Sequence, residues 1–471
     1  MDTRQTIFIA IGRAGHARNL LFHDFLRLLS GKYRIVFLLS DNDPEFRETF
    51  GAYDIEELRK KQITPFKKKL ETVFKSIHRA LIFNPSSEVF AGLGRGTSIN
   101  GALLYNGELV KYKRLRYFLA KRVFGTLLAR KSVRSFFKYL DGKIFPCAAY
   151  DELIDAYAPA LVFITSIGSD DQVALLRNCK QRGVASAGMA GSWDNASKWG
   201  FREKAGLLAV WSDYMKYEVT QFQGYAEEET AVIGIPQFDR YVDPDLCSKD
   251  EFVKKFRLDP AKKTIFFGSE GPICTEDPYV VSFLQKKIQD GALSGYQVLV
   301  RPHFNYQERD TERYAPLVDN DTVFMDMFYR ASSFKDGVSI SMETAHNLIA
   351  EIRHCDVAIT SASTLVLDII ANGKQPILYS FDENKTKPFK ESTRRLYGSL
   401  WFREIFKFGL DNVAHNEDEL IEKIKEIAAN PDKDLDKRGA LIERLCYRID
   451  GKSGRRLFDI VDAHIQNQSK K

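Results

Sequence analysis

Residues 7–16, IFIAIGRAGH, indicate the fold class of this chain. Ile7–Ile11 is a continuous apolar run, which is typical of a strand buried on both faces of a parallel sheet. A glycine turn follows from Gly12 to His16, and apolar residues then recur at helical spacing from Leu20 to Leu29. A second apolar run at Ile35–Leu39 closes a βαβ unit of about 30 residues. The chain therefore opens as a Rossmann-like unit.

The alternation of strands and helices continues in both halves of the chain. Near residue 240 the composition changes to a turn-rich joint, and Ser248 with Glu251 forms a capping box that opens a new helix. We predict an α/β protein with two Rossmann-like domains that face each other across a cleft. They span residues 1–245 and 246–471, and the second includes a C-terminal helix near Arg456–Ile465. Ligands of such folds bind at the carboxyl ends of the strands. Strands are expected at 160–165, 184–189, 207–211, 264–267, 297–301, 323–325, 357–360 and 376–379.

Composition excludes several classes of protein. The 471 residues are 44% hydrophobic and 28% charged, which rules out global disorder. The six cysteines form no CxxC pair, and this excludes a disulfide scaffold and the usual zinc patterns. No apolar run reaches the roughly 18 residues of a membrane span, and the first run is too short for a secretory signal. We expect a soluble cytoplasmic protein.

One stretch is strongly basic. Residues 60–140 contain 18 Lys and Arg but only 3 Asp and Glu, a net charge of +15, so the rest of the chain carries −9. Within it, residues 111–138 interleave basic side chains with apolar ones at helical spacing. This pattern predicts peripheral contact with an anionic membrane surface. The alternative is a helix packed on the N-terminal sheet with its basic face in solvent.

Two groups of candidate residues follow strands of the first half. Gly12, Arg13 and His16 form the turn after the first strand, where the backbone and a helix N-terminus could receive an anionic ligand. The alternative is a turn that serves geometry alone. Trp193, Asp194 and Asn195 follow the strand at 184–189, and Asp194 is a candidate general base. Its alternative role is an Asx turn that caps the next segment.

Two further groups follow strands of the second half. Arg301 and His303 flank a proline and suit an anionic leaving group, because both donate hydrogen bonds to phosphate oxygens. A capping histidine beside a surface arginine is the alternative. Ser361, Ser363 and Thr364 open a helix, where hydroxyls and backbone amides could hold a phosphate without a metal or act as ordinary N-caps.

Asp368 lies one helical turn beyond Thr364. It could accept hydrogen bonds from a ribose or simply lie on a solvated face. No cluster of His, Asp, Glu or Cys has metal-ligand spacing, so we predict neither a metal site nor a bound cofactor.

Taken together, these motifs resemble a family. The order Thr264–Gly268, Arg301-Pro302-His303, Cys355–Thr364 and Gly373–Pro376 is similar to the donor domain of GT-B glycosyltransferases. The branch resembled is that of CDP-glycerol glycerophosphotransferases and capsule or surface-polysaccharide transferases. The resemblance implies that Gly268 and Ser269 join the donor-side residues. Glycerophosphotransferases place a catalytic histidine in the first domain, and this sequence offers Asp194 as the nearest acid.

The resemblance implies a metal-independent glycosyltransferase whose substrates are a nucleotide-sugar donor and a glycan or lipid-linked acceptor. Alternatives with the same fold are a polyol-phosphate transferase that uses a CDP-linked donor and a sugar-nucleotide epimerase. A nucleic-acid-binding protein built on residues 60–140 is the alternative outside enzymes. That stretch lacks the aromatic signatures and zinc ligands of nucleic-acid modules, so no nucleic-acid partner is expected.

Overall fold

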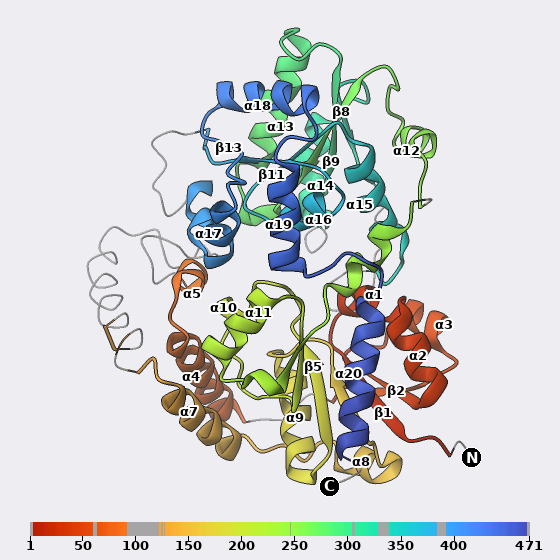
Figure 1. The fold of residues 1–471 in the computed structure, drawn as a ribbon, viewed down its shortest axis with the longest axis vertical. Coiled ribbons are helices and arrows are strands. Elements are labelled where there is room, and N and C mark those ends of the chain that lie inside the picture. The colour runs from red at the N-terminus through yellow and green to blue at the C-terminus, as the bar shows by residue number, and fades with distance from the viewer. Residues whose placement is uncertain are drawn as a thin grey trace.

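Two parallel β-sheets, one from each half of the chain, form the frame of the molecule (Figure 1). The computed structural model describes residues 3–59, 64–91, 122–123, 126, 128–244, 246–303, 307–327, 339–383 and 392–468. The first sheet has the strand order β3-β2-β1-β4-β5-β6-β7 and the second β10-β9-β8-β11-β12-β13. Both orders reverse direction beside the first strand of their half, at β1/β4 and at β8/β11, where doubly wound sheets form their ligand crevices. The predicted fold class is confirmed.

Ten strands match the apolar runs expected from the sequence, and three edge strands were not expected. The first sheet contains β1 (Thr6–Ile11), β2 (Arg34–Leu39), β3 (Asp54–Glu57), β4 (Leu161–Ile164), β5 (Ala185–Met189), β6 (Leu207–Val210) and β7 (Thr230–Val232). The second contains β8 (Lys263–Gly268), β9 (Tyr296–Arg301), β10 (Val323–Met325), β11 (Val357–Thr360), β12 (Pro376–Tyr379) and β13 (Val413–Ala414). Every residue of β1, β4, β11 and β12 is buried, as expected for strands covered on both faces.

Helices of the first half cover both faces of its sheet. They are α1 (Ala14–Leu21), α2 (Asp24–Lys32), α3 (Pro44–Phe50), α4 (Pro65–Leu81), α5 (Pro85–Ala91), α7 (Lys131–Ile144), α8 (Asp151–Tyr157), α9 (Asp170–Arg182), α10 (Asn195–Lys198) and α11 (Asp213–Glu218). A π-helical turn η2 (Val219–Gln223) extends α11, and the 3₁₀ turns are η3 (Glu227–Glu229) and η4 (Pro236–Val242). The apolar residues at helical spacing after the glycine turn belong to two helices, α1 and α2.

The second half has its own helices. These are α12 (Lys249–Phe256), α13 (Asp277–Gln289), α14 (Gln307–Tyr314), α15 (Glu343–His354), α16 (Leu365–Ala371), α17 (Leu400–Lys407), α18 (Glu417–Ala429), α19 (Leu435–Cys446) and α20 (Ser453–Gln468), with 3₁₀ turns η5 (Gly271–Ile273), η6 (Ala315–Leu317) and η7 (Thr393–Gly398). The predicted capping box opens α12: Ser248 Oγ accepts from the Glu251 amide, and Glu251 accepts from the Ser248 amide.

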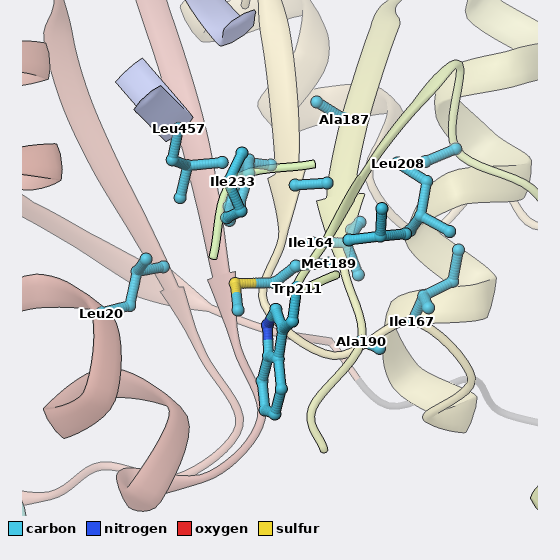
Figure 2. Close-up of a cluster of buried hydrophobic side chains, with 14 of the residues drawn as sticks. Leu20, Ile164, Ile167, Ala187, Met189, Ala190, Leu208, Trp211, Ile233 and Leu457 are labelled. Carbon is cyan, nitrogen blue, oxygen red and sulfur yellow. The ribbon is translucent and has the colours of Figure 1, made fainter. Parts of the chain in front are cut away.

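The last helix packs on the first half rather than the second. In Figure 1, α20 lies against the lower half of the molecule, beside β5. Figure 2 shows Leu457 of α20 among the core side chains of the first sheet, near Ile233. The predicted boundary near residue 245 therefore separates the two sheets, but α20 belongs by its packing to the first domain. An apolar face at Leu457, Val461 and Ile465 predicts a buried helix, but it does not indicate which sheet the helix packs against.

The two halves are joined by an apolar interface. Trp193 of the first half meets Trp401 of α17 edge to face, with ring centroids 4.9 Å apart. Side chains of α16, α17 and α19 belong to the same continuous hydrophobic cluster as the first sheet. The loops that follow the strands of one sheet therefore lie against loops and helices of the other.

Candidate functional site

The β5–α10 loop carries the predicted base, Asp194, at the interface between the halves. The Asp194 side chain is 7% exposed. Its Oδ1 accepts from Asn195 Nδ2 at 3.0 Å, and its Oδ2 pairs with Lys198 Nζ at 3.2 Å. The carboxylate makes no capping bond to α10, so the alternative role of an N-cap is not what the structure shows. Asp194 is instead a carboxylate with a cation partner.

The predicted acceptor residues lie beside this loop. Trp193 packs on Trp401, and its Nε1 finds no hydrogen-bond partner among the described residues. A Cβ on Gly191 would lie 2.8 Å from His16 Nε2 and from Ser166 Oγ, so this close approach requires glycine. The imidazole of His16 therefore lies against the loop that leads to Asp194. This contact was not predicted from the sequence.

Of the predicted acceptor residues in the turn after β1, only His16 lies against the loop of Asp194. Arg13 is exposed at the N-cap of α1, and the carbonyl of Gly12 accepts from Ser40 Oγ at 3.1 Å. Burial and the nearby Arg13 lower the pKa of His16 to about 4, so its imidazole is neutral at physiological pH. His16 and Gly191 line a cavity of about 10 Å³, room for about one water molecule.

Glu270 is an acid of the site that sequence reasoning missed. It follows Ser269 at the carboxyl end of β8, and its side chain hydrogen-bonds Ser363 in the loop after β11. Across the interface it interacts electrostatically with Lys198 and Asp194. Burial, with the neighbouring acids, raises the pKa of Glu270 to about 8. Its position two residues beyond a strand end was the available signal.

The loop that carries Glu270 is fixed by a buried aspartate. Asp277 Oδ2 accepts from the Glu270 amide at 2.8 Å and from Ser269 Oγ at 3.0 Å, and Tyr379 Oη donates to Asp277 Oδ1. Burial raises the pKa of Asp277 to about 6. Ser269, a predicted donor residue, is therefore held inside its own loop.

The predicted donor residues adjoin one another by strand register. Gly268 pairs with Thr360 on one side and Arg301 on the other. A Cβ on Gly268 would clash with the Leu365 side chain, so glycine lets α16 pack over the strand end. The structure thus places the ends of β8, β9 and β11 side by side.

The serine and threonine residues before α16 differ in their contacts. Ser361 is fully buried, and its Oγ has no partner among the described residues. Ser363 Oγ accepts from the Leu365 amide at 3.3 Å, whereas Thr364 occupies the N-cap without a side-chain capping bond. Ser363 is thus the member of this group that hydrogen-bonds Glu270.

Arg301 is engaged by acids of its own half. Its Nη1 lies 2.8 Å from Asp326 and 2.7 Å from Glu351, and its Nη2 donates to the carbonyl of Thr344 at 2.9 Å. The side chain is 11% exposed, so the surface arginine weighed from the sequence is not observed. Both terminal nitrogens of the guanidinium are used within the domain, which leaves its phosphate-binding role a prediction.

His303 has an imidazole that is neutral at physiological pH. Burial lowers its pKa to about 4, and the nearby Asp310 offsets this only in part. The His303 amide donates to Asp310 Oδ2 at 2.7 Å, and Asp310 pairs with Arg313 at 2.6 Å. Arg313 in turn donates to the carbonyl of Cys274, which ties the His303 turn to the loop of Glu270.

Asp368 lies apart from the Asp194–Glu270 group, at a second contact between the halves. Tyr241 Oη of η4 donates to Asp368 Oδ1. Burial raises the pKa of Asp368 to about 6, while Tyr241, Arg301 and Arg18 act in the opposite direction. Asp368 therefore does not lie on a solvated face, and its ribose-binding role stays a prediction.

The basic stretch is described only in part, and residues 111–121 lie outside the described residues. In α7, Arg134 Nη2 donates to the carbonyl of Gln221 at 2.7 Å and Lys138 Nζ to that of Gln223 at 2.6 Å. These two cations face the protein, contrary to the predicted membrane-facing pattern, because the π-helical turn offers them carbonyls. Phe136 and Tyr139 are 58% and 64% exposed.

Within the described ranges, no group of three or more His, Cys, Asp or Glu side chains could hold a metal ion. No helix in the described part of the chain is long and apolar enough to cross a bilayer. A groove of about 360 Å³ beside η5 and α13 is lined by none of the predicted site residues.

Comparison with known families identifies the chain. Residues 177–462 match the family CDP-Glycerol:Poly(glycerophosphate) glycerophosphotransferase. The chain belongs to this family. The match begins in α9 and covers both loops of the interface described above, those of Asp194 and Glu270. The protein is therefore a transferase-type enzyme of the GT-B class, as the motifs predicted.

Solved structures share the fold at low sequence identity. A putative UDP-N-acetylglucosamine 2-epimerase from Listeria monocytogenes has a TM-score of 0.53 and 12% identity over 99% of this chain and 98% of its own. A co-structure of S. aureus MnaA with UDP has a TM-score of 0.52 and 10% identity over 98% and 97%. The UDP-GlcNAc 2-epimerase from Neisseria meningitidis, bound to UDP-GlcNAc, has a TM-score of 0.50 and 9% identity over 97% and 99%. No curated protein sequence matches this chain.

Proposed function

We propose that the protein transfers a sugar from a nucleotide-sugar donor to a hydroxyl of a surface-polysaccharide or lipid-linked glycan acceptor. The observation that carries this proposal is that Glu270 of the second half, hydrogen-bonded to Ser363, lies close enough to Asp194 of the first half to interact with it electrostatically. This meeting point lies at the carboxyl ends of both sheets, where ligands of such folds bind. Family membership supports a nucleotide-linked donor.

In this proposal the two halves take different substrates. Asp194 removes the proton of the acceptor hydroxyl, which then attacks the donor's anomeric carbon. Ser363, with Ser361 and Thr364, lies on the donor side. Because Trp193 and Trp401 pack together, we expect the halves to separate for a nucleotide to bind and to close around it.

A second candidate keeps the site and changes the transferred group. The family is described by transfer of glycerophosphate from CDP-glycerol, which favours a polyol phosphate carried on CDP. The acceptor hydroxyl would then attack phosphorus instead of carbon, with Asp194 in the same role. The described residues offer the same acid and hydroxyl groups to both reactions.

A thermal-shift screen separates the two candidates. UDP-, GDP- and CDP-linked sugars are compared with CDP-glycerol, because a ligand at about 100 times its dissociation constant stabilises the folded state by about 2.7 kcal/mol. A shift with a nucleotide sugar supports glycosyl transfer, and a shift with CDP-glycerol alone supports polyol-phosphate transfer. No shift with any of these donors would contradict the proposal.

Metal independence is a further part of the proposal. Ser363 and the neutral His303 would act by hydrogen bonds to the donor phosphate. Turnover should therefore persist after exhaustive treatment with EDTA. Loss of turnover that Mg²⁺ or Mn²⁺ restores would overturn this part alone.

The proposed function also includes peripheral attachment of the protein to the cytoplasmic face of a membrane. Arg130 and Lys131 are exposed at the start of α7, near the exposed Phe136 and Tyr139. Basic and aromatic side chains together favour an anionic bilayer surface. Flotation with anionic liposomes at low salt should carry the protein upward, and neutral liposomes should not. Protein that stays at the bottom with both would contradict membrane attachment.

A further inference from the structure

Glu270, beside the predicted donor residue Ser269, is the side chain of this interface that differs most from the sequence-based expectation. His303 was expected to stabilise a leaving phosphate by hydrogen bonding, and burial lowers its pKa to about 4, so its imidazole is neutral at neutral pH. Glu270, two residues beyond the end of β8, lies between the two halves. Burial raises its pKa to about 8. A carboxylic acid in this state can give a proton to a departing phosphate oxygen.

The carboxyl groups of Glu270 and Asp194 have different bonding partners. Both carboxylate oxygens of Asp194 are engaged, Oδ1 by Asn195 and Oδ2 by Lys198. Glu270 instead hydrogen-bonds a neutral hydroxyl, that of Ser363, on the loop after β11. Its main chain is locked because its amide donates to Asp277 at 2.8 Å. The two acids thus approach one interface from opposite halves, one with a cation partner and one with a hydroxyl partner.

We propose that Glu270 is the general acid of the reaction, opposite Asp194 as the general base. This assignment rests on the proposed function. The acceptor O–H gives its proton to Asp194, and the acceptor oxygen forms a bond to the transferred carbon or phosphorus. The bond from that atom to the nucleotide phosphate oxygen breaks, and its electron pair stays on that oxygen. Glu270 gives its proton to the same oxygen and becomes a carboxylate, and solvent returns both acids to their starting states.

The assignment makes the rate depend on pH in a defined direction. The charged and titratable groups that face Glu270 are Asp277 of α13, Lys198 and Asp194 across the interface, and Tyr397 of η7. Burial and the two aspartates favour the acid, whereas the hydrogen bond from Ser363 and the charge of Lys198 favour the carboxylate. Because the acid form is required, kcat/KM should fall as pH rises through about 8.

The decisive experiment compares Glu270→Gln with the wild-type enzyme on the donor found in the thermal-shift screen. Glutamine keeps the shape and the hydrogen bond to Ser363 but has no proton to give. We expect kcat to fall by about 10²–10³, donor KM to stay within about threefold, and the alkaline limb of the pH profile to disappear. Glu270→Asp, which keeps an acid, should recover part of the rate together with the alkaline limb.

Glu422→Gln is the control, because Glu422 is an exposed acid on α18 of the same half. It should keep wild-type turnover. If Glu270→Gln retains turnover within threefold and the alkaline limb, the assignment is overturned while the proposed function stands. If the wild type transfers no group from any donor, the proposed function fails, and the assignment falls with it.

Discussion

The loop after β5 and the loop after β8 each bring one carboxyl group to the interface. The two carboxyl groups have different neighbours. Asp194 lies 3.2 Å from a lysine, whereas Glu270 meets the hydroxyl of Ser363 and the electrostatic influence of a second buried acid, Asp277. Asp194 is buried and Glu270 is half-buried, so solvent exposure alone does not explain their difference. A cation within salt-bridge distance favours the charged form, and without one burial favours the neutral acid. The comparison assigns the base to the first half and the acid to the second.

Removal of the base should have the largest effect. Asp194→Asn keeps the shape of the loop but loses the basicity, so we expect transfer to fall by about 10²–10⁴ while donor binding changes little. Initial rates and donor-induced thermal shifts measure the two effects separately. Asp213→Asn, at an exposed position after the next strand, is the control. A variant that keeps more than a few per cent of activity would eliminate the role of Asp194, and lost donor binding would show that Asp194 organises its loop instead.

Arg301 should matter more for stability than for chemistry. Arg301→Ala leaves Glu351, which is fully buried, and Asp326 without their cation. Loss of one partner from such a group costs about 3–5 kcal/mol of unfolding free energy. Denaturant unfolding measures it, with the exposed Arg309→Ala as control. A loss below about 1 kcal/mol, together with a large rise in donor KM, would return Arg301 to the phosphate-binding role.

Lys198 tests the electrostatic difference between the loops. Lys198 lowers the pKa of Glu270, so Lys198→Gln should move the alkaline limb of the rate profile above pH 8. Turnover should also fall about tenfold, because Asp194 loses its ion-pair partner. The pH profile of kcat/KM measures both changes, and Lys180→Gln, at an exposed lysine, is the control. An alkaline limb that stays in place would separate Lys198 from Glu270.

His303 should show the smallest effect. Because its pKa is about 4, the imidazole is neutral above that pH and contributes an ordinary hydrogen bond. We expect His303→Ala to lower turnover about tenfold, by the same factor at every pH from 6 to 9. His415→Ala, at an exposed site, is the control. An effect that is large at pH 6 and vanishes by pH 8 would mean that a protonated His303 takes part.

Most of the fold was readable from the sequence, and the exceptions have physical causes. The buried strands are continuous apolar runs such as Ile7–Ile11, whose pattern needs no knowledge of neighbours. The missed strands β3, β7 and β13 all lie at sheet edges, and β3, with the sequence DIEE, keeps polar side chains in water. The position of α20 depends on contacts between distant parts of the chain, which periodicity does not encode.

The places of the candidate residues in the fold were predictable from the sequence, but their chemical states were not. The rule that ligands bind after strand ends singled out Asp194, Ser363 and His303, because parallel sheets gather their loops at one edge. The same rule could have found Glu270, but no motif singled it out. Ionisation was beyond sequence reasoning, since the states of His303 and Glu270 depend on burial and on side chains contributed by the opposite loops.

Acceptor-dependent release of nucleotide tests the central claim most directly. The enzyme is incubated with the nucleotide-linked donor, with and without a hydroxyl-bearing glycan or lipid-linked acceptor, and free nucleotide and product are quantified. We predict release in a one-to-one ratio with product, only when acceptor is present, and its loss in both Asp194→Asn and Glu270→Gln. Equal release without acceptor, or full release by both variants, would contradict a transferase site formed by the two opposed acids.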